Sequence, residues 1–141
     1  ALAEIRRVLV PGGVLAMVWN ERDHREAWIR EWTATVDGLA LAEGERPYHR
    51  HQDTDWATVV AADGGYDPLH HELFDNPQVG TPNGLVERAR SMSYVASLDA
   101  ERQGEVLDAV RALVARHPDL AGRDRFPFPY LTHVHVTRRS V

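Results

Sequence analysis

The chain has 141 residues, of which 43% are hydrophobic and 26% are charged, and its formal net charge is −5. This composition is ordinary for a globular domain. Its basic residues are interspersed with acidic ones, so neither nucleic acid nor an anionic membrane surface is expected as a partner. The absence of cysteine excludes disulfides and thiolate zinc sites and favours the cytoplasm. No apolar run approaches the ~20 residues of a membrane span.

The first elements are predicted to be a helix over residues 1–9 and a strand over Val14–Val18, with a turn at Pro11, Gly12 and Gly13 between them. The strand has no polar alternation, which is typical of a strand inside a sheet that helices cover on both faces. A buried helix segment is the alternative, and the double glycine and short length favour the strand.

This strand is expected to end at Trp19 and Asn20, before a helix over about residues 24–39. Asp23 is predicted to cap that helix, with Glu26 at the third helical position in a capping-box pattern. The apolar residues of the helix recur on one face, which predicts that the face packs on a core; they are Trp28, Ile29, Trp32, Val36 and Leu39.

The rest of the chain alternates helices with strands, as a wound α/β sheet does. The patterns predict loops over 41–53 and 76–84, helices over 55–62, 81–91 and 100–117, and strands over 68–74 and 129–137. The apolar residues of the helix over 100–117 recur at helical spacing and are Val106, Leu107, Val110, Leu113 and Val114. Strict alternation in the last strand places Tyr130, Thr132, Val134 and Val136 on one face and Leu131, His133 and His135 on the other. No linker is visible, so we expect a single domain over residues 1–141.

Three stretches carry a resemblance to a known family. Residues 3–20, AEIRRVLVPGGVLAMVWN, resemble class I S-adenosylmethionine-dependent methyltransferases where a helix, a Pro-Gly-Gly turn and the fifth strand follow one another. RSMSYVASLDAER at Arg90–Arg102 and PYLTHVHVTRR at Pro129–Arg139 are similar to its small-molecule branch. The resemblance implies an α/β fold with a partial Rossmann-like sheet of the fifth to seventh strands, the last antiparallel and inserted between the other two, with flanking helices.

The resemblance also implies what is absent. The family binds S-adenosylmethionine in its first half, through a Gly-rich turn after the first strand and an acidic residue after the second. This chain has no G-x-G pattern and no strand before its first helix. We therefore expect the carboxy-terminal part of a methyltransferase domain, which neither binds S-adenosylmethionine nor is active by itself. The edge of the strand Val14–Val18 would then be open to pairing.

Candidate substrate-binding residues come from two arguments. Ligands of open α/β sheets bind at the carboxyl ends of the parallel strands, where Trp19, Asn20, Glu21 and Arg22 lie. Of these, Trp19, Asn20 and Arg22 are taken as candidates for substrate binding. Alternatively, Asn20 and Asp23 only organise the turn between strand and helix. The further candidates are Trp28, Arg90, Tyr94 and His133.

These further candidates also have structural alternatives. Trp28 and Trp32 lie four residues apart on a helix, and core packing is favoured over a stacking platform. Arg90 and Tyr94 resemble a family stretch near the substrate entrance, and a polar helix end explains them equally well.

The eight histidines raise the question of a metal. His49 and His51 in HRHQDTD have a metal-like spacing but no preceding strand, and His133 and His135 share a strand face as a zinc pair can. The sequence places no third ligand, so no metal site is expected. His70 and His71 would point to opposite faces of their strand.

Imidazoles titrate near neutrality, which makes His71, His133 and His135 candidate general bases. None of the three is favoured over the others, and no catalytic residue is assigned.

The leading hypothesis is the substrate-side half of a small-molecule methyltransferase. The alternative is a non-catalytic α/β module that dimerises or docks through its open sheet edge. A histidine-dependent metal hydrolase is the third and weakest hypothesis.

Overall fold

The described part of the chain forms two compact units. The computed structural model describes residues 1–42, 45 and 54–141. The first unit combines residues 1–21, 50–76 and 130–141, and the second combines 22–49 and 77–129. The single domain expected over 1–141 stays a prediction, and most of the loop predicted over 41–53 lies outside the described residues.

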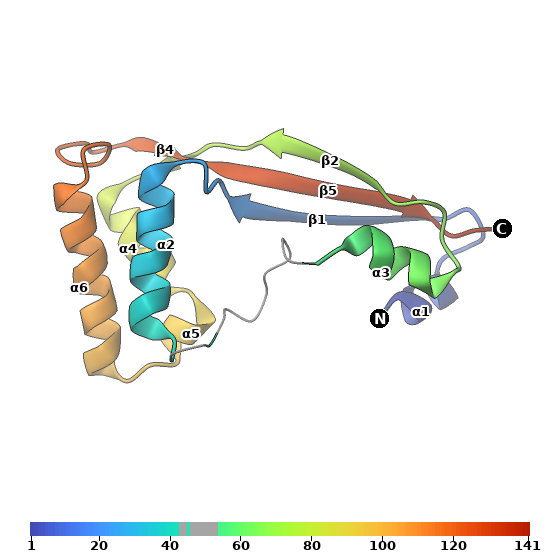
Figure 1. Cartoon of the computed structure of the whole chain (residues 1–141), viewed down its shortest axis with the longest axis horizontal. Helices are drawn as coiled ribbons and strands as arrows, with labels where there is room; N and C mark the ends of the chain where they lie inside the picture. The colour runs from blue at the N-terminus through green and yellow to red at the C-terminus, as the bar shows by residue number, and fades with distance from the viewer. Residues whose placement is uncertain (43–44, 46–53) are drawn as a thin grey trace. The chain divides into compact units, whose positions relative to one another are not determined.

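The first unit is built on a three-stranded sheet with the order β1-β5-β2 (Figure 1). Its strands are β1 (Val14–Arg22), β2 (His70–Asp75) and β5 (Tyr130–Arg138). Strand β5 is antiparallel to β2. The N–H of Gly12 donates to the carbonyl of Arg139, and the N–H of Arg139 donates to the carbonyl of Gly13, so β5 also runs against β1. The central position and antiparallel direction expected for the last strand are confirmed.

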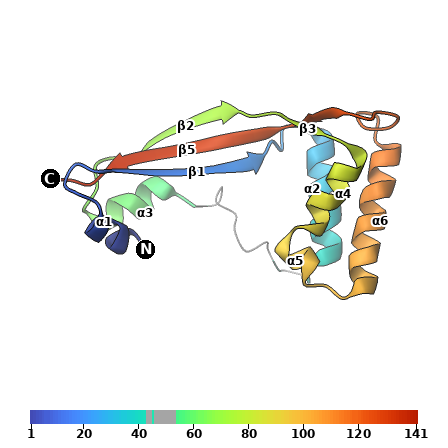
Figure 2. The same ribbon diagram turned by 180° about the vertical axis from the view of Figure 1, so that it is seen from behind.

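Strand β1 differs from its prediction in length and in burial. It has nine residues and continues to Arg22, so Trp19 and Asn20 lie within it. The predicted burial on both faces is wrong for the described part of the chain, because Val14 and Val18 are 45% and 59% exposed. The two described helices of this unit lie on one side of its sheet, and neither covers the opposite face (Figures 1 and 2).

These helices are α1 (Leu2–Val8) and α3 (Trp56–Asp63), close to the predicted ranges. They are held together by an ion pair of 3.0 Å between Arg6 Nε and Asp63 Oδ1. Helix α3 begins where the side chain of Asp55 accepts the N–H of Thr58, and it ends at Gly64, whose φ of +70° favours glycine.

The capping box predicted at Asp23 is wrong. Helix α2 begins only at Ala27, and Glu26 at its N-cap makes no side-chain cap. The carboxylate of Asp23 accepts the backbone N–H and the guanidinium of Arg25 instead, and this hydrogen bonding lowers the pKa of Asp23. The Asp23 N–H donates to the carbonyl of Pro129, which keeps this residue outside the helix.

The described residues of the second unit form four helices and a two-stranded sheet. Its elements are α2 (Ala27–Ala40), β3 (Gln78–Gly80), α4 (Pro82–Arg90), α5 (Ser93–Ala96), α6 (Ala100–Arg116) and β4 (Phe126–Phe128). All five apolar residues of α6 that the periodicity selects are buried: Val106, Leu107, Val110, Leu113 and Val114. On α2 the prediction fails at Leu39, which is 40% exposed, while the neighbouring Ala40 is buried.

The short elements of this unit were not predicted. Strand β3 lies in the predicted loop 76–84 and pairs antiparallel with β4. Three-residue strands carry too little alternation to be recognised, and Pro127 in β4 argues against a strand. The predicted start of α4 is confirmed, since Thr81 Oγ1 accepts the N–H of Gly84 at 3.0 Å. Among the described residues, no helix is both long and apolar enough to cross a membrane.

Candidate functional site

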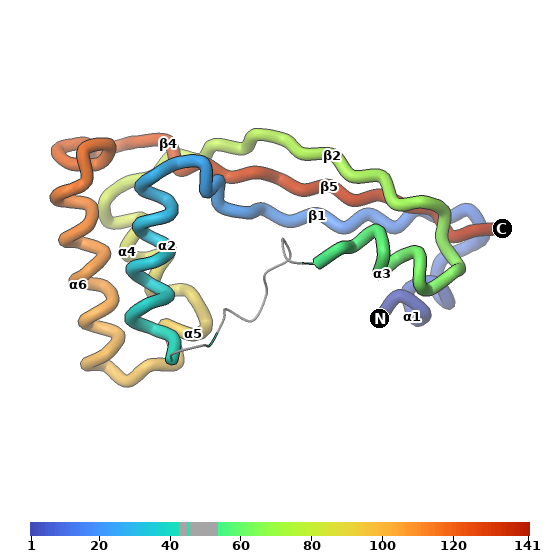
Figure 3. Tube along the Cα trace, viewed as in Figure 1, coloured from blue at the N-terminus to red at the C-terminus, as the bar shows by residue number. Residues whose placement is uncertain are grey.

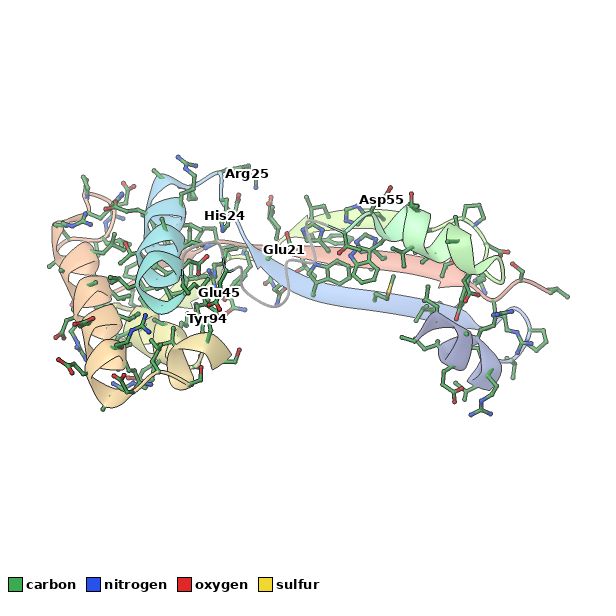
Figure 4. The ribbon with its side chains drawn as sticks, turned by 60° about the horizontal axis from the view of Figure 1, so that its bottom comes forward. Glu21, His24, Arg25, Glu45, Asp55 and Tyr94 are labelled. Carbon is green, nitrogen blue, oxygen red and sulfur yellow. The ribbon has the colours of Figure 1, made fainter. Side chains whose placement is uncertain are left out.

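A cavity of about 300 Å³ lies in the first unit, between the start of α3 and the covered face of the sheet. Figure 4 shows Glu21 on β1 and Asp55 at the start of α3. The cavity is lined mainly by aromatic and imidazole rings: Trp19, Thr54, Asp55, Trp56, Ala57, Leu69, His71, His133 and His135. The continuous chain trace in Figure 3 shows that β1, β2 and β5, which supply most of these rings, are far apart in sequence.

Strand register brings three histidines together on this face. His71 of β2 pairs with His135 of β5, and Leu73 pairs with His133. The rings of His71 and His135 stack with centroids 4.0 Å apart and planes 7° apart. His71 Nε2 lies 3.2 Å from His133 Nδ1. The prediction that His70 and His71 face opposite sides is confirmed, because His70 lies with Glu72 on the other face.

Glu21 and Trp19 of β1 support this cluster. Glu21 Oε2 is 3.3 Å from His133 Nε2, and Glu21 Oε1 accepts a hydrogen bond from Trp19 Nε1 at 3.2 Å. The Trp19 ring stacks on His135 at 4.7 Å and on His133 at 5.8 Å. The Trp19 indole therefore orients the Glu21 carboxylate, and this carboxylate in turn orients the His133 imidazole.

His135 is the buried member of the cluster, with 6% of its surface exposed. Its Nδ1 has no hydrogen-bond partner among the described residues. Burial lowers the pKa of His135, the neighbouring His71 and His133 lower it further, and the charge of Glu21 opposes them. The neutral imidazole, which has a free lone pair, is favoured.

A separate polar cluster in the second unit surrounds Arg22. Its guanidinium lies over the Trp32 ring at 4.5 Å and donates to Thr33 Oγ1 at 3.1 Å. Nη2 of Arg22 also contacts the sulfur of Met92 at 3.7 Å. None of the described carboxylates forms an ion pair with Arg22. This partly buried cation is thus held in place by neutral groups.

Tyr94 joins the same cluster. Its hydroxyl donates to Asp37 Oδ1 at 2.7 Å and lies 3.0 Å from the Met92 sulfur. Burial and the hydrogen bond and charge of Asp37 raise the pKa of Tyr94 to about 12, with Arg22 opposing the shift. The hydroxyl therefore stays protonated at neutral pH.

The remaining predicted site residues lie elsewhere. Asn20 is on the open face of the sheet, where its Oδ1 accepts from Thr132 Oγ1 at 2.6 Å, so Trp19 and Asn20 face opposite sides. Trp28 is 4% exposed and meets Phe126 and Phe128 edge to face, in agreement with the core-packing interpretation.

Arg90 lies at the end of α4, 3.7 Å from Glu87. The structure thus brings Trp19 near His133 and Arg22 near Tyr94 within their respective units. The roles of the predicted site residues in substrate binding stay predictions.

The sequence analysis named Glu21 among the residues at the end of β1, but it did not predict the contact of Glu21 with His133. It missed Trp56 of the cavity, because the position of this residue depends on the docking of α3. His49 and His51 lie outside the described residues.

No family model matches this chain. Curated proteins do match it: uncharacterized methyltransferases of Mycobacterium tuberculosis and Mycobacterium bovis are 32% identical over 140 residues, which cover 94% of this chain and 49% of theirs. An uncharacterized methyltransferase of Schizosaccharomyces pombe is 25% identical over 135 residues, and the alignment covers 94% of this chain and 50% of the yeast protein. The resemblance to methyltransferases is confirmed.

The chain spans about half the length of the curated relatives it matches. A crystal structure of a Bacillus halodurans protein described as a candidate methyltransferase also aligns with this chain. The alignment covers 99% of this chain and 57% of the Bacillus protein, with 16% identity and a TM-score of 0.45.

Proposed function

We propose that this chain is the substrate-side half of an S-adenosylmethionine-dependent methyltransferase that acts on a small molecule. The observation that carries the proposal is the similarity to proteins named methyltransferases over 94% of the chain. The sheet order β1-β5-β2 agrees with the expected fifth, seventh and sixth strands of a larger Rossmann-like sheet.

We infer that the half of the domain described here does not bind S-adenosylmethionine by itself. Nucleotide-type ligands of wound sheets bind where a Gly-rich turn follows a strand. Here Gly12 and Gly13 lie between α1 and the amino end of β1, so this turn precedes its strand. S-adenosylmethionine supplies an electrophilic methyl group, and we assign its binding to the half of the relatives that this chain does not match.

We assign substrate recognition to the cluster around Arg22 and Tyr94. A guanidinium without a carboxylate partner in the described chain is suited to bind a substrate carboxylate in a bidentate manner. The Tyr94 hydroxyl donates its single proton to Asp37, which holds α5 beside the guanidinium. The contacts with Trp32 and Thr33 fix the guanidinium in advance, which lowers the entropy cost of binding.

A carboxylate substrate also simplifies the chemistry. Methyl transfer is an in-line displacement, and the protein must hold the nucleophile about 3–3.5 Å from the methyl carbon and aligned with it. A carboxylate is already ionised at neutral pH, so its oxygen needs no general base. The task of this half is then orientation and exclusion of water.

The test is reconstitution. The 141-residue chain alone and a fusion to the unmatched half of the Mycobacterium tuberculosis relative are titrated calorimetrically with S-adenosylmethionine. We expect only the fusion to bind S-adenosylmethionine and to transfer labelled methyl to small acids. Arg22→Ala should abolish this transfer, and Arg111→Ala, at an exposed arginine that pairs with Asp108 on α6, should retain it. Micromolar binding by the chain alone would contradict its assignment as a half, and a folded fusion without binding would contradict the function.

The non-catalytic alternative is favoured by one observation. Strands β1 and β2 form the margins of the sheet, and no described strand pairs with the outer edge of either. Such edges pair readily with other chains, and the same titrations would then detect no S-adenosylmethionine binding in either protein.

A further inference from the structure

We propose that His71, His133 and His135 form a binding site for a divalent transition-metal ion, with zinc as the favoured ion. One ligand nitrogen from each imidazole lies within 4.8 Å of the others. Imidazole nitrogens are common zinc ligands, and three of them with one open position form a typical non-structural zinc site. The inference goes beyond the proposed methyltransferase function and does not depend on it.

The distance between two of the ligands fits a metal. Zinc–nitrogen bonds of about 2.0–2.1 Å in a tetrahedral site place the nitrogens about 3.4 Å apart. His71 Nε2 and His133 Nδ1 are 3.2 Å apart. These two atoms come from strands separated by 62 residues, and the antiparallel register of β2 and β5 holds them in place.

Glu21 completes the arrangement around the second ligand. If His133 binds the metal through Nδ1, its Nε2 is left to donate to Glu21 Oε2, 3.3 Å away. Metal-binding histidines almost always donate their other ring N–H to a carboxylate or carbonyl, which fixes the tautomer and raises the basicity of the ligand. The Trp19 indole N–H in turn fixes Glu21.

His135 has the unused capacity that a third ligand needs. It is 6% exposed, and its Nδ1 finds no partner in the described part of the chain. A buried imidazole nitrogen without a hydrogen bond is unfavourable, and coordination of this ring would offset part of that cost. The free side of the cluster opens into the cavity of about 300 Å³, where a water or a ligand oxygen fits as the fourth ligand.

Metal binding requires a rotation of the rings. The three imidazoles lie within 11° of parallel, so their in-plane lone pairs do not yet converge on one point. The torsion between Cβ and the ring is broad and inexpensive to change. The exposed ring of His71 is the least constrained of the three and would turn most.

Nearby carboxylates favour a bound cation electrostatically but are already engaged in other hydrogen bonds, so they do not act as metal ligands. Both carboxylate oxygens of Asp55, at the cavity wall, accept hydrogen bonds from Thr58, at 3.1 and 2.6 Å. Asp55 and Glu21 therefore contribute negative potential while the histidines supply the ligand atoms.

The test is titration of the full chain with Zn²⁺ and with Co²⁺, without S-adenosylmethionine. We expect one ion per chain and, for Co²⁺, the strong visible absorption of a four-coordinate ion. His71→Ala and His133→Ala should each weaken binding at least about 100-fold, and Glu21→Gln about 10–100-fold. His70→Ala is the matched control, because this exposed neighbour lies on the other face of β2, and binding should be unchanged.

Three results would overturn the proposal: no binding by the folded chain, binding that survives His71→Ala, or equal losses in His70→Ala and His71→Ala. The chain has five other histidines, and if those alone bind the metal, binding will survive His71→Ala. His71→Ala keeps the test decisive if the variant at His133 fails to fold, since the side chain of His71 is exposed.

Discussion

The Tyr94 hydroxyl donates a hydrogen bond of 2.7 Å to Asp37 Oδ1, across 57 residues of sequence. This bond fastens the four-residue helix α5 to α2 and places a protonated hydroxyl beside Arg22. A helix of one turn is not stable by itself, so the position of this part of the candidate substrate site depends on such tertiary contacts.

Tyr94→Phe is therefore expected to destabilise the second unit. The variant keeps the ring but leaves Asp37 without this donor, and hydrogen bonds to charged groups contribute about 1.5–3 kcal/mol. Because the site is only partly buried, we expect a loss of about 1–2 kcal/mol in urea unfolding followed by tryptophan fluorescence. An unchanged unfolding midpoint would show that the bond contributes nothing to the fold.

The same residue predicts how stability depends on alkaline pH. The pKa of Tyr94 is raised from 10.0 to about 12 in the folded chain. Between these values the unfolded chain loses the proton while the folded chain keeps it, so stability is full below pH 10 and falls as the pH rises toward 12. Urea unfolding across this range should show a steeper loss for the native chain than for Tyr94→Phe. Equal slopes would contradict the assignment.

Prediction from the sequence succeeded where the pattern is long and local. Helix α6 has 17 residues, and its apolar stripe identified five buried residues because the helical repeat recurs over several turns. The alternation in β5 likewise placed His133 and His135 on one face. It failed at Asp23, where the local capping pattern was overridden by pairing with Pro129 and by the Arg25 side chain.

The rest of the candidate site depends on contacts that a local pattern does not contain. His71 joins His133 and His135 only because β2 pairs with β5 in this register, and His133 lies 62 residues after His71 in the sequence. Exposure of Val18 has the same origin. Its apolar neighbours predict a buried strand, but Val18 is 59% exposed, and the described helices of its own unit lie on the other face of the sheet.

A third prediction concerns the start of α4. Thr81 Oγ1 accepts the N–H of Gly84, one of the donors that the first helical turn leaves without a partner. Thr81→Ala should cost about 1 kcal/mol in the free energy of unfolding, whereas Thr81→Ser keeps the oxygen and should cost only a few tenths. Thermal unfolding followed by circular dichroism separates the two variants, and equal losses would exclude capping as the cause.

The core of the second unit should be most sensitive at Phe128. Its ring is fully buried, meets Trp28 and Trp32 edge to face, and carries the Arg88 guanidinium at 4.6 Å. Phe128→Ala removes these contacts and leaves a cavity, so we expect a loss of about 3–5 kcal/mol.

Val79→Ala in the paired strand β3 is the control for Phe128→Ala. Val79 is 67% exposed, and its variant should stay within about 0.5 kcal/mol of the native chain. Urea unfolding measures both variants, and a comparable effect at the two positions would show that the burial of Phe128 does not determine its contribution.

The open face of the first unit predicts self-association. Val14, Val18 and Phe74 are 45%, 59% and 47% exposed, and the outer edge of β1 is unpaired in the described sheet. Exposed apolar strands at a sheet edge favour pairing with a second chain. We expect sedimentation velocity to show a dimer fraction that grows with concentration and that Val18→Lys suppresses.

Two controls connect this association to the sheet and to the proposed missing half. Val10→Lys adds the same charge at a 70% exposed position in the turn before β1, and it should leave association unchanged. Fusion to the unmatched half of the Mycobacterium tuberculosis relative should give a monomer, because that half would cover the apolar face and pair with β1. If the chain is monomeric at every concentration, or if both lysine variants act alike, the open face does not drive association. A fusion that still dimerises would favour the non-catalytic module over the methyltransferase half.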